Sequence, residues 1–315
     1  MSPRRHRAAP ALAAGLALAL FANTAQTQQR KVEPDVAFAA FQNGYFLSAF
    51  KEATLRLEKS ADDAAAMTLL GELYRQGLGV RRDPARATEW YRLAFERGDL
   101  NAQHAYAAAL IAGSGTAKDE ARGVALMEQA ADKGQPEAAY SLALRKLASG
   151  TDVDLPRAIA LLRIATDAEI GEAQHALGVL VKTGRGVAAD PDIAADLMRR
   201  AASNGSLAGE VELAIMTFNG NGTGRDERAA ARLFQRAAAK GNAIAQNRLA
   251  RLYASGRGLP LNPVEAVGWH LAAKAQGLGD ATLERVLDQL SGADRARAYD
   301  LAASRIESNA LTRAR

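Results

Sequence analysis

The chain contains no cysteine, so it can form no disulfide, no thiolate nucleophile and no cysteine-linked lipid anchor. Aromatic residues make up only 5% of it, which suits close helix–helix packing better than a β-sandwich or barrel. The formal net charge is only +5, and Arg4, Arg5 and Arg7 supply three of these charges. Nucleic-acid binding needs clustered cations with interleaved aromatics, and no such cluster is present, so we expect no nucleic-acid partner.

The sequence also lacks the common catalytic, metal-binding and nucleotide-binding motifs. The chain has no Gly-x-Ser-x-Gly elbow, no His-Glu-x-x-His pair and no Walker loop. Each Gly-x-Gly pair follows an expected helix, whereas a dinucleotide fingerprint follows a strand. We therefore expect no catalytic residue, no cofactor and no metal site.

The first 25 residues have the three parts of a secretory signal peptide. A basic head from Met1 to Arg7 precedes an apolar run from Ala8 to Ala22, and Asn23-Thr24-Ala25 offers a cleavage point before Gln26. The apolar run has about 15 residues, whereas a membrane-spanning helix needs about 20. We expect a mature protein in a bacterial periplasm with no membrane span. The alternatives are a secreted protein and one anchored by an uncleaved N-terminal segment.

What the chain does have is a repeated pair of amphipathic helices. Ala66 to Tyr74 carries apolar residues at i, i+3, i+4, i+7 and i+8, which places them on one face of a helix. Gly77 and Gly79 end that helix, since glycine adopts positive φ without a steric clash. Asp83-Pro84 starts a second helix, because Asp caps free N–H groups and Pro fits the first helical position. The unit is an antiparallel αα-hairpin that Gly98 closes.

This unit recurs five more times, at a spacing of 35 or 36 residues. The turn glycines recur at Gly113/Gly115, Gly184/Gly186, Gly220/Gly222 and Gly256/Gly258. The expected helix caps recur at Asp119, Asp154, Asp190, Asp226 and Asn262, and a small packing residue recurs at Ala94, Ala130, Ala165, Ala201, Ala237 and Ala273. The closing glycine recurs at Gly134, Gly205, Gly241 and Gly277, with Glu169 in its place in the third unit. One hairpin cannot bury its apolar face alone, so the pattern predicts an all-α stack of helix pairs.

The run L-G-x-L-Y-x-x-G-x-G-V-x-x-D…A-x-x-W-Y-x-x-A-x-x-x-G, from Leu70 to Gly98, resembles the Sel1-like repeat, a relative of the tetratricopeptide repeat. The resemblance implies a right-handed α-solenoid of stacked antiparallel helix pairs with a concave face. It departs from the family pattern in the third unit, where Lys146 stands at the position of Tyr74 and Ser149-Gly150-Thr151 replaces the turn glycines.

The repeat divides the chain into four parts. We expect a signal peptide at residues 1–25, a polar tether and N-terminal capping helix pair at 26–62, six repeats at 63–279, and C-terminal capping helices and a tail at 280–315. The last helix is expected to run from Ala293 to Ile306, followed by a frayed tail. The aromatics of the first cap are either core under that cap or an exposed apolar docking patch; they are Phe38, Phe41, Tyr45, Phe46 and Phe50.

Recognition is expected from the first helix of each repeat, on the side that faces the groove. The candidate partner-binding residues lie at adjacent positions near the start of the first helix in three repeats and are Gln103, His104, Gln174, His175, Asn247 and Arg248. A solvated helix surface is the alternative for each of them. His104 and His175 are two repeats apart, so they are not expected to share a metal ion. His270 is expected to be a packing residue.

The sequence therefore predicts a non-catalytic scaffold for protein–protein interaction, with an envelope protein or a cell-wall component as its partner. Within the resembled family, exported members include the periplasmic exopolysaccharide production negative regulators, which restrain a membrane sensor kinase. That resemblance implies a signalling regulator. Cysteine-rich members have been linked with penicillin binding or hydrolysis, so a cell-wall or β-lactam hydrolase is the alternative, although this chain lacks those cysteines.

Overall fold

The computed structural model describes residues 35–151 and 153–314, and this part of the chain forms sixteen helices and no strand. The predicted signal peptide at residues 1–25 and the tether up to Pro34 lie outside the described residues. Consecutive helices pack as antiparallel pairs, and each pair packs on the next. The chain is a right-handed α-solenoid, as the repeat predicts.

Each repeat contributes two helices. The first helices are α3 (Ala64–Gln76), α5 (Leu100–Ala112), α7 (Pro136–Ala148), α9 (Gly171–Thr183), α11 (Leu207–Asn219) and α13 (Ala243–Ser255). The second helices are α4 (Pro84–Glu96), α6 (Glu120–Asp132), α8 (Leu155–Asp167), α10 (Pro191–Ser203), α12 (Glu227–Ala239) and α14 (Pro263–Lys274). The pair α1 (Val36–Gln42) and α2 (Phe46–Lys59) precedes the repeats, and α15 (Ala281–Gln289) and α16 (Gly292–Ala314) follow them.

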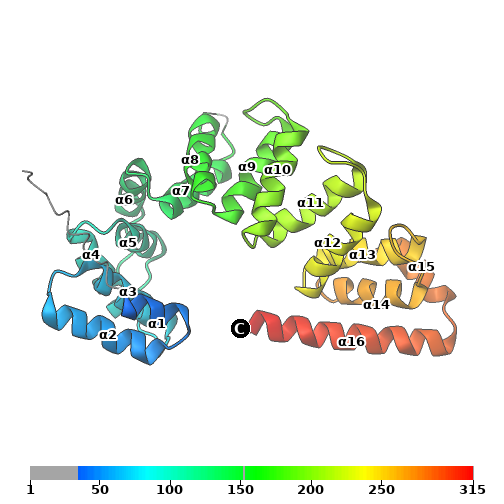
Figure 1. Cartoon of the computed structure of the whole chain (residues 1–315), viewed down its shortest axis with the longest axis horizontal. Helices are drawn as coiled ribbons and strands as arrows, with labels where there is room; N and C mark the ends of the chain where they lie inside the picture. The colour runs from blue at the N-terminus through cyan, green and yellow to red at the C-terminus, as the bar shows by residue number, and fades with distance from the viewer. Residues whose placement is uncertain (1–34, 152, 315) are drawn as a thin grey trace, which may run out of the picture.

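The pairs are arranged along an arch (Figure 1). The second helices α6, α8 and α10 lie on its outer side, and the first helices α5 and α7 lie toward its concave side. Helix α16 runs below the arch, along α14, with which it is in contact. The first helices are therefore the elements that present side chains to the concave side of the arch.

The helix ends follow from the residues predicted to make them. Five of the six expected caps accept a hydrogen bond from a backbone N–H two or three residues further on; they are Asp83, Asp119, Asp190, Asp226 and Asn262. In the same repeats, the first glycine of each turn ends its helix in the left-handed conformation. These two signals set where five of the six first helices end and where five of the six second helices begin.

The expectation that Asp154 caps α8 is wrong. Asp154 has φ −80° and ψ −15°, which is already helical, and its side chain accepts no bond from the start of α8. Its carboxylate instead accepts hydrogen bonds from the hydroxyls of Ser149 and Thr151, at 2.9 and 2.8 Å, and from Lys146 at 3.3 Å. The third repeat keeps one left-handed glycine in this turn, Gly150 with φ 69°, and the polar cluster joins the end of α7 to the start of α8.

Glu169 adopts the backbone conformation that glycine has at the other closing positions. Its φ is 60°, and it is the one non-glycine residue with positive φ among the described residues. Its carboxylate accepts hydrogen bonds from Gln174 at 2.7 Å, from Asn204 at 2.6 Å and from Arg200. These bonds join the third repeat to the fourth and offset the steric cost of the left-handed conformation.

The core of the stack is built largely from alanine. The recurring packing residue is buried in every repeat, with 0% exposure at Ala94, Ala130, Ala165, Ala201, Ala237 and Ala273. Small residues let helices approach closely, because no side chain separates their backbones. The prediction of close helix packing at these positions is confirmed.

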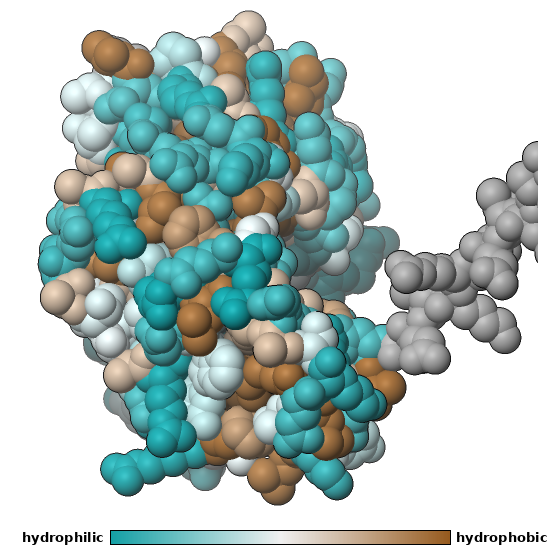
Figure 2. All heavy atoms as spheres, turned by 90° about the vertical axis from the view of Figure 1, so that its left-hand side faces the viewer, coloured by the Kyte–Doolittle hydropathy of each residue, from teal (hydrophilic) through white to brown (hydrophobic). Residues whose placement is uncertain are grey.

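Some aromatic residues of the first cap belong to the core under the cap, and others are exposed at its surface. Phe41, Phe46 and Phe50 pack against the core under α1 and α2. Phe38 and Tyr45 are 48% and 68% exposed. Seen from this end, apolar side chains form several separate patches among polar ones (Figure 2). The cap is therefore mainly core, with two exposed rings at its edge.

The C-terminal helix is longer than the sequence pattern suggested. We expected it to end at Ile306 with a frayed tail, but α16 continues to Ala314. Arg305 anchors it: the guanidinium lies 3.8 Å from the centroid of the Trp269 ring and donates to Glu265 at 2.6 Å. Both partners lie on α14, so α16 covers the exposed side of the last repeat.

Candidate functional site

The inner face, as we define it, consists of the first-helix side chains that occupy the positions of Thr68, Leu69 and Glu72 in each repeat. Two hollows open on it, and both are lined by side chains from neighbouring first helices. In the order of those three positions, its later members are His104, Ala105, Ala108; Tyr140, Ser141, Leu144; His175, Ala176, Val179; Val211, Glu212, Ile215; and Asn247, Arg248, Arg251.

The N-terminal hollow has a volume of about 640 Å³ and is lined by residues of α1, α3, α4 and α5. It exists because Ala105 and Ala108 are too small to fill the space beside α3. At its wall, the Tyr91 hydroxyl donates to Glu72 at 2.8 Å. Burial acts to raise the pKa of Glu72, but hydrogen bonds from Arg75, Tyr91 and Gln76 outweigh it and lower the pKa. The hollow thus has a fixed carboxylate in a mainly apolar wall.

The two inner-face histidines are half-buried. The Nε2 atom of His104 lies 3.2 Å from the Ser141 hydroxyl on the next first helix. Burial lowers the pKa of His104 and of His175, and nearby glutamates oppose that shift. His104 lines the N-terminal hollow. No group of three or more His, Cys, Asp or Glu side chains within the described residues is placed to hold a metal ion.

The glutamines at the preceding position have a place inside the stack. Gln103 and Gln174 are 1% and 0% exposed. Gln103 donates to the Leu126 carbonyl at 2.9 Å, and Gln174 donates to Glu169. Gln246, their counterpart in the last repeat, is equally buried and donates to the Ala238 carbonyl at 3.1 Å. These three side chains join helices to one another and offer little surface to a partner.

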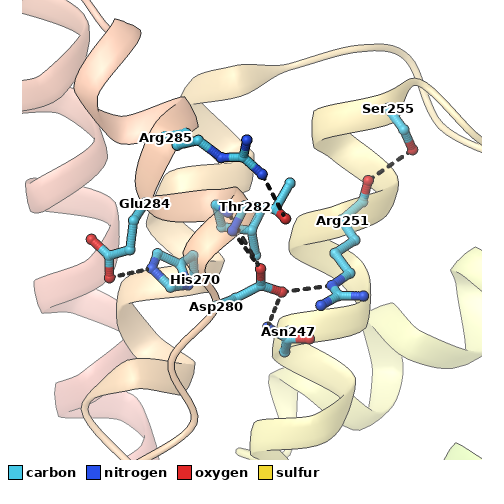
Figure 3. A network of polar contacts seen from close by, with 9 residues as sticks. Asn247, Arg251, Ser255, His270, Asp280, Thr282, Glu284 and Arg285 are labelled. Atoms are coloured by element: carbon cyan, nitrogen blue, oxygen red, sulfur yellow. Dashed lines mark hydrogen bonds and ion pairs between the residues drawn. The ribbon is translucent and has the colours of Figure 1, made fainter.

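Asn247 belongs to a polar network that ties the last repeat to α15 (Figure 3). Asn247 and Arg251 both donate to one oxygen of Asp280, at 3.0 and 2.6 Å, and the other oxygen accepts the N–H of Thr282 at 3.0 Å. Burial acts to raise the pKa of Asp280, but these hydrogen bonds outweigh it and hold the pKa at about 2. Asn247 is 9% exposed, so its described contacts are internal.

Arg248 is exposed and lines the C-terminal hollow, which has a volume of about 220 Å³. Arg251 and Arg257 line the same hollow, together with Phe218 and other apolar side chains. The sequence pattern did not single out Arg251, Arg257 or Phe218. They come from two repeats and a loop, and only the stacking of the repeats brings them together.

Across the described residues, no helix is both long enough and apolar enough to pass through a bilayer. The Sel1 repeat model matches six consecutive segments of the chain, at residues 64–99, 100–135, 136–169, 171–206, 208–242 and 243–278.

Chitin synthase regulatory factor 3 of Schizosaccharomyces pombe is 30% identical to the chain over 156 residues. That alignment covers 47% of this chain and 17% of the relative, so the chain matches only a small part of that protein.

Among solved structures, the chain is similar to c5321, a protective antigen of uropathogenic Escherichia coli that displays an SLR fold. The TM-score is 0.55 and the identity 22%, over 88% of this chain and 68% of the other. A Sel1 repeat protein from Oxalobacter formigenes matches with 22% identity and a TM-score of 0.42, over 85% of this chain and 98% of that one. The likeness to solved structures concerns the fold alone. Six matched repeats span most of the chain, and the chain therefore belongs to the Sel1 repeat family.

Proposed function

We propose that the chain is a non-catalytic scaffold of the bacterial periplasm that binds a segment of another protein along its inner face. The observation that supports this most strongly is the continuity of that face over six repeats, with a hollow near each end. Stacked repeats build extended concave surfaces, and such surfaces suit extended or helical segments better than small molecules.

The side chains of the inner face fit a peptide segment in the middle of the arch. Leu144, Val179 and Ile215 occupy one position in three successive repeats, and Leu144 is 42% exposed. Glu137 and Glu172 are exposed on α7 and α9, seven residues or about two turns before Leu144 and Val179. An apolar row beside acidic side chains would receive an amphipathic segment with apolar and basic residues.

The periplasmic part of the proposal is supported by the basic head and apolar run of residues 1–25. We propose further that binding regulates its partner, with a membrane sensor kinase as the first candidate. The family resemblance supports this, as does the similarity to a protein described as a regulatory factor. A deletion strain with unchanged kinase signalling and unchanged polysaccharide output would contradict the regulatory part alone.

Affinity capture from a native envelope extract tests the scaffold. Leu144→Asp places a charge on the inner face, and Ile193→Asp makes the same kind of change at a 53% exposed residue of α10, on the outer side of the arch. The parent protein and Ile193→Asp are expected to retain the same protein, and Leu144→Asp is expected to lose it. Capture of no specific protein, or turnover of a chromogenic β-lactam by the pure chain, would contradict the proposal.

A further inference from the structure

The C-terminal hollow has a charge pattern unlike the rest of the inner face. Three arginines line it, Arg248, Arg251 and Arg257, and no acidic residue is among its lining side chains. Elsewhere the inner face carries acids, such as Glu72 in the first repeat and Glu212 in the fifth. Asp280 and Glu227 pair with Arg251 and Arg257, so the positive charge that a ligand group meets in this hollow comes chiefly from Arg248.

The three guanidinium groups differ in how far the protein already uses them. Arg257 is held by Glu227 and lies 4.3 Å from the centroid of the Phe218 ring. Arg251 donates to Asp280 through Nε, so the edge between its two Nη groups is not used by that bond (Figure 3). Arg248 is exposed at the same hollow. The two paired arginines are fixed in place, and Arg248 is the one available to take a new anionic partner.

The remaining lining is largely apolar. Ile215, Phe218, Phe234 and Leu252 line the hollow, with Asn219 and Ser255 at its polar side. A phosphate group alone would leave these apolar walls exposed to water. The volume of about 220 Å³ is below the range of about 300–1,000 Å³ that is typical of sites for whole small molecules, so one or two side chains fit it better.

We propose that the C-terminal hollow binds a carboxylate next to a large apolar side chain on the partner segment. The carboxylate pairs with Arg248 and the free edge of Arg251, and the apolar side chain contacts Phe218 and Leu252. This rests on the proposed scaffold function and adds a direction to it. The acidic and apolar end of the segment lies at the last repeats, and its basic part lies against Glu137 and Glu172.

An array of immobilised nonapeptides tests the assignment with the full purified chain. Each peptide carries Leu or Phe beside Glu, Gln, Lys or phosphoserine in an otherwise constant sequence. Peptides with Glu beside Leu or Phe are expected to retain the protein best, with retention that falls as salt rises. Arg248→Glu is expected to weaken the best peptide about tenfold or more, since a charge-assisted contact becomes a repulsion. Arg248→Lys is expected to keep most of the affinity.

Arg232→Glu is the matched control, because Arg232 is exposed on α12 and is not among the residues that line the hollow. It changes the net charge equally and is expected to leave retention unchanged. Equal retention by Arg248→Glu, a preference for phosphoserine or for Lys, or retention of no peptide would overturn the assignment. If Arg248→Glu captures the same envelope protein as the parent chain, the scaffold proposal stands and only the assignment of this site is wrong.

Discussion

Ala201 and Gly209 lie back to back where the fourth repeat meets the fifth: a Cβ added to Gly209 would fall 2.5 Å from the Cβ of Ala201. Ala201 is completely buried, and the helices α10 and α11 are in contact along this line. The space between the two helices holds the methyl group of Ala201 but not a second one on Gly209. The spacing of the repeats thus depends on small residues.

Ala201→Arg should therefore unfold the stack locally. A buried site without spare volume cannot take the longer side chain, and burial of its charge removes the charge from water, so we expect a loss of more than about 3 kcal/mol in unfolding free energy. Chemical denaturation followed by circular dichroism measures it. Ala208→Arg, at an exposed position on α11, is the control and should change stability little. An unchanged denaturation midpoint for Ala201→Arg would show that the packing is different.

The closing position of the third repeat allows a comparison of two substitutions. Glu169→Ala removes the bonds to Gln174, Asn204 and Arg200 but keeps a Cβ in the left-handed region. Glu169→Gly removes the same bonds and also the steric cost. We expect both to destabilise relative to the parent, and Glu169→Ala to be the less stable of the two by about 1 kcal/mol. Equal stability of the two variants would mean that Glu169 does not adopt positive φ in solution.

Three glycines of the fourth and fifth repeats allow the energetic cost of positive φ to be separated from the steric clash of an added Cβ. Gly222 has φ +66°, and an added Cβ would lie 1.8 Å from the Pro191 carbonyl oxygen. Gly205 has φ +87° with open space around it, and Gly224 has open space without positive φ. Alanine should therefore destabilise most at Gly222, by about 1 kcal/mol at Gly205 and least at Gly224. Any other order in thermal melts would contradict the turn geometry.

The stability of the last repeat should depend on pH through Asp280. The side-chain pKa of an aspartate in an unfolded chain is about 3.9, whereas the pKa of Asp280 in the folded chain is about 2. Folding therefore favours the deprotonated form, and the contribution is complete above about pH 4 and is lost as the pH falls toward 2.

Asp280→Asn should thus lower the unfolding free energy by about 1–2 kcal/mol at pH 7, and the difference from the parent should shrink between pH 4 and 2. Denaturation at a series of pH values measures it. Asp300→Asn, at an exposed position on α16, should behave as the parent at every pH. A difference that stays constant down to pH 2 would contradict the ion pair with Arg251.

Most of the fold was predictable because the helix starts and ends depend on residues close to them in the sequence. Asp83 and Gly77 act within a few residues of themselves, so the sequence shows their roles directly. Asp154 was mispredicted because its neighbours Ser149 and Thr151 compete for its carboxylate. The length of α16 was missed because Arg305 is held by Trp269, a contact that local sequence does not show.

The candidate site was less predictable, because a hollow forms only where neighbouring repeats place small side chains next to each other. The N-terminal hollow requires Ala105 beside Tyr91, and the C-terminal hollow requires Arg257 of one repeat over Phe218 of another. The repeat position does place His104 and Arg248 on the inner face. It does not distinguish His104 from Gln103, which is one residue away and buried.

The most direct test of the account is site-specific photo-cross-linking in living cells. A photoreactive residue in place of Leu144 on the inner face should form a covalent adduct with one defined protein. The same residue in place of Ile193 on α10 should form none. An adduct at position 193 with none at position 144, or no protein adduct at either position, would contradict a partner segment bound along the inner face.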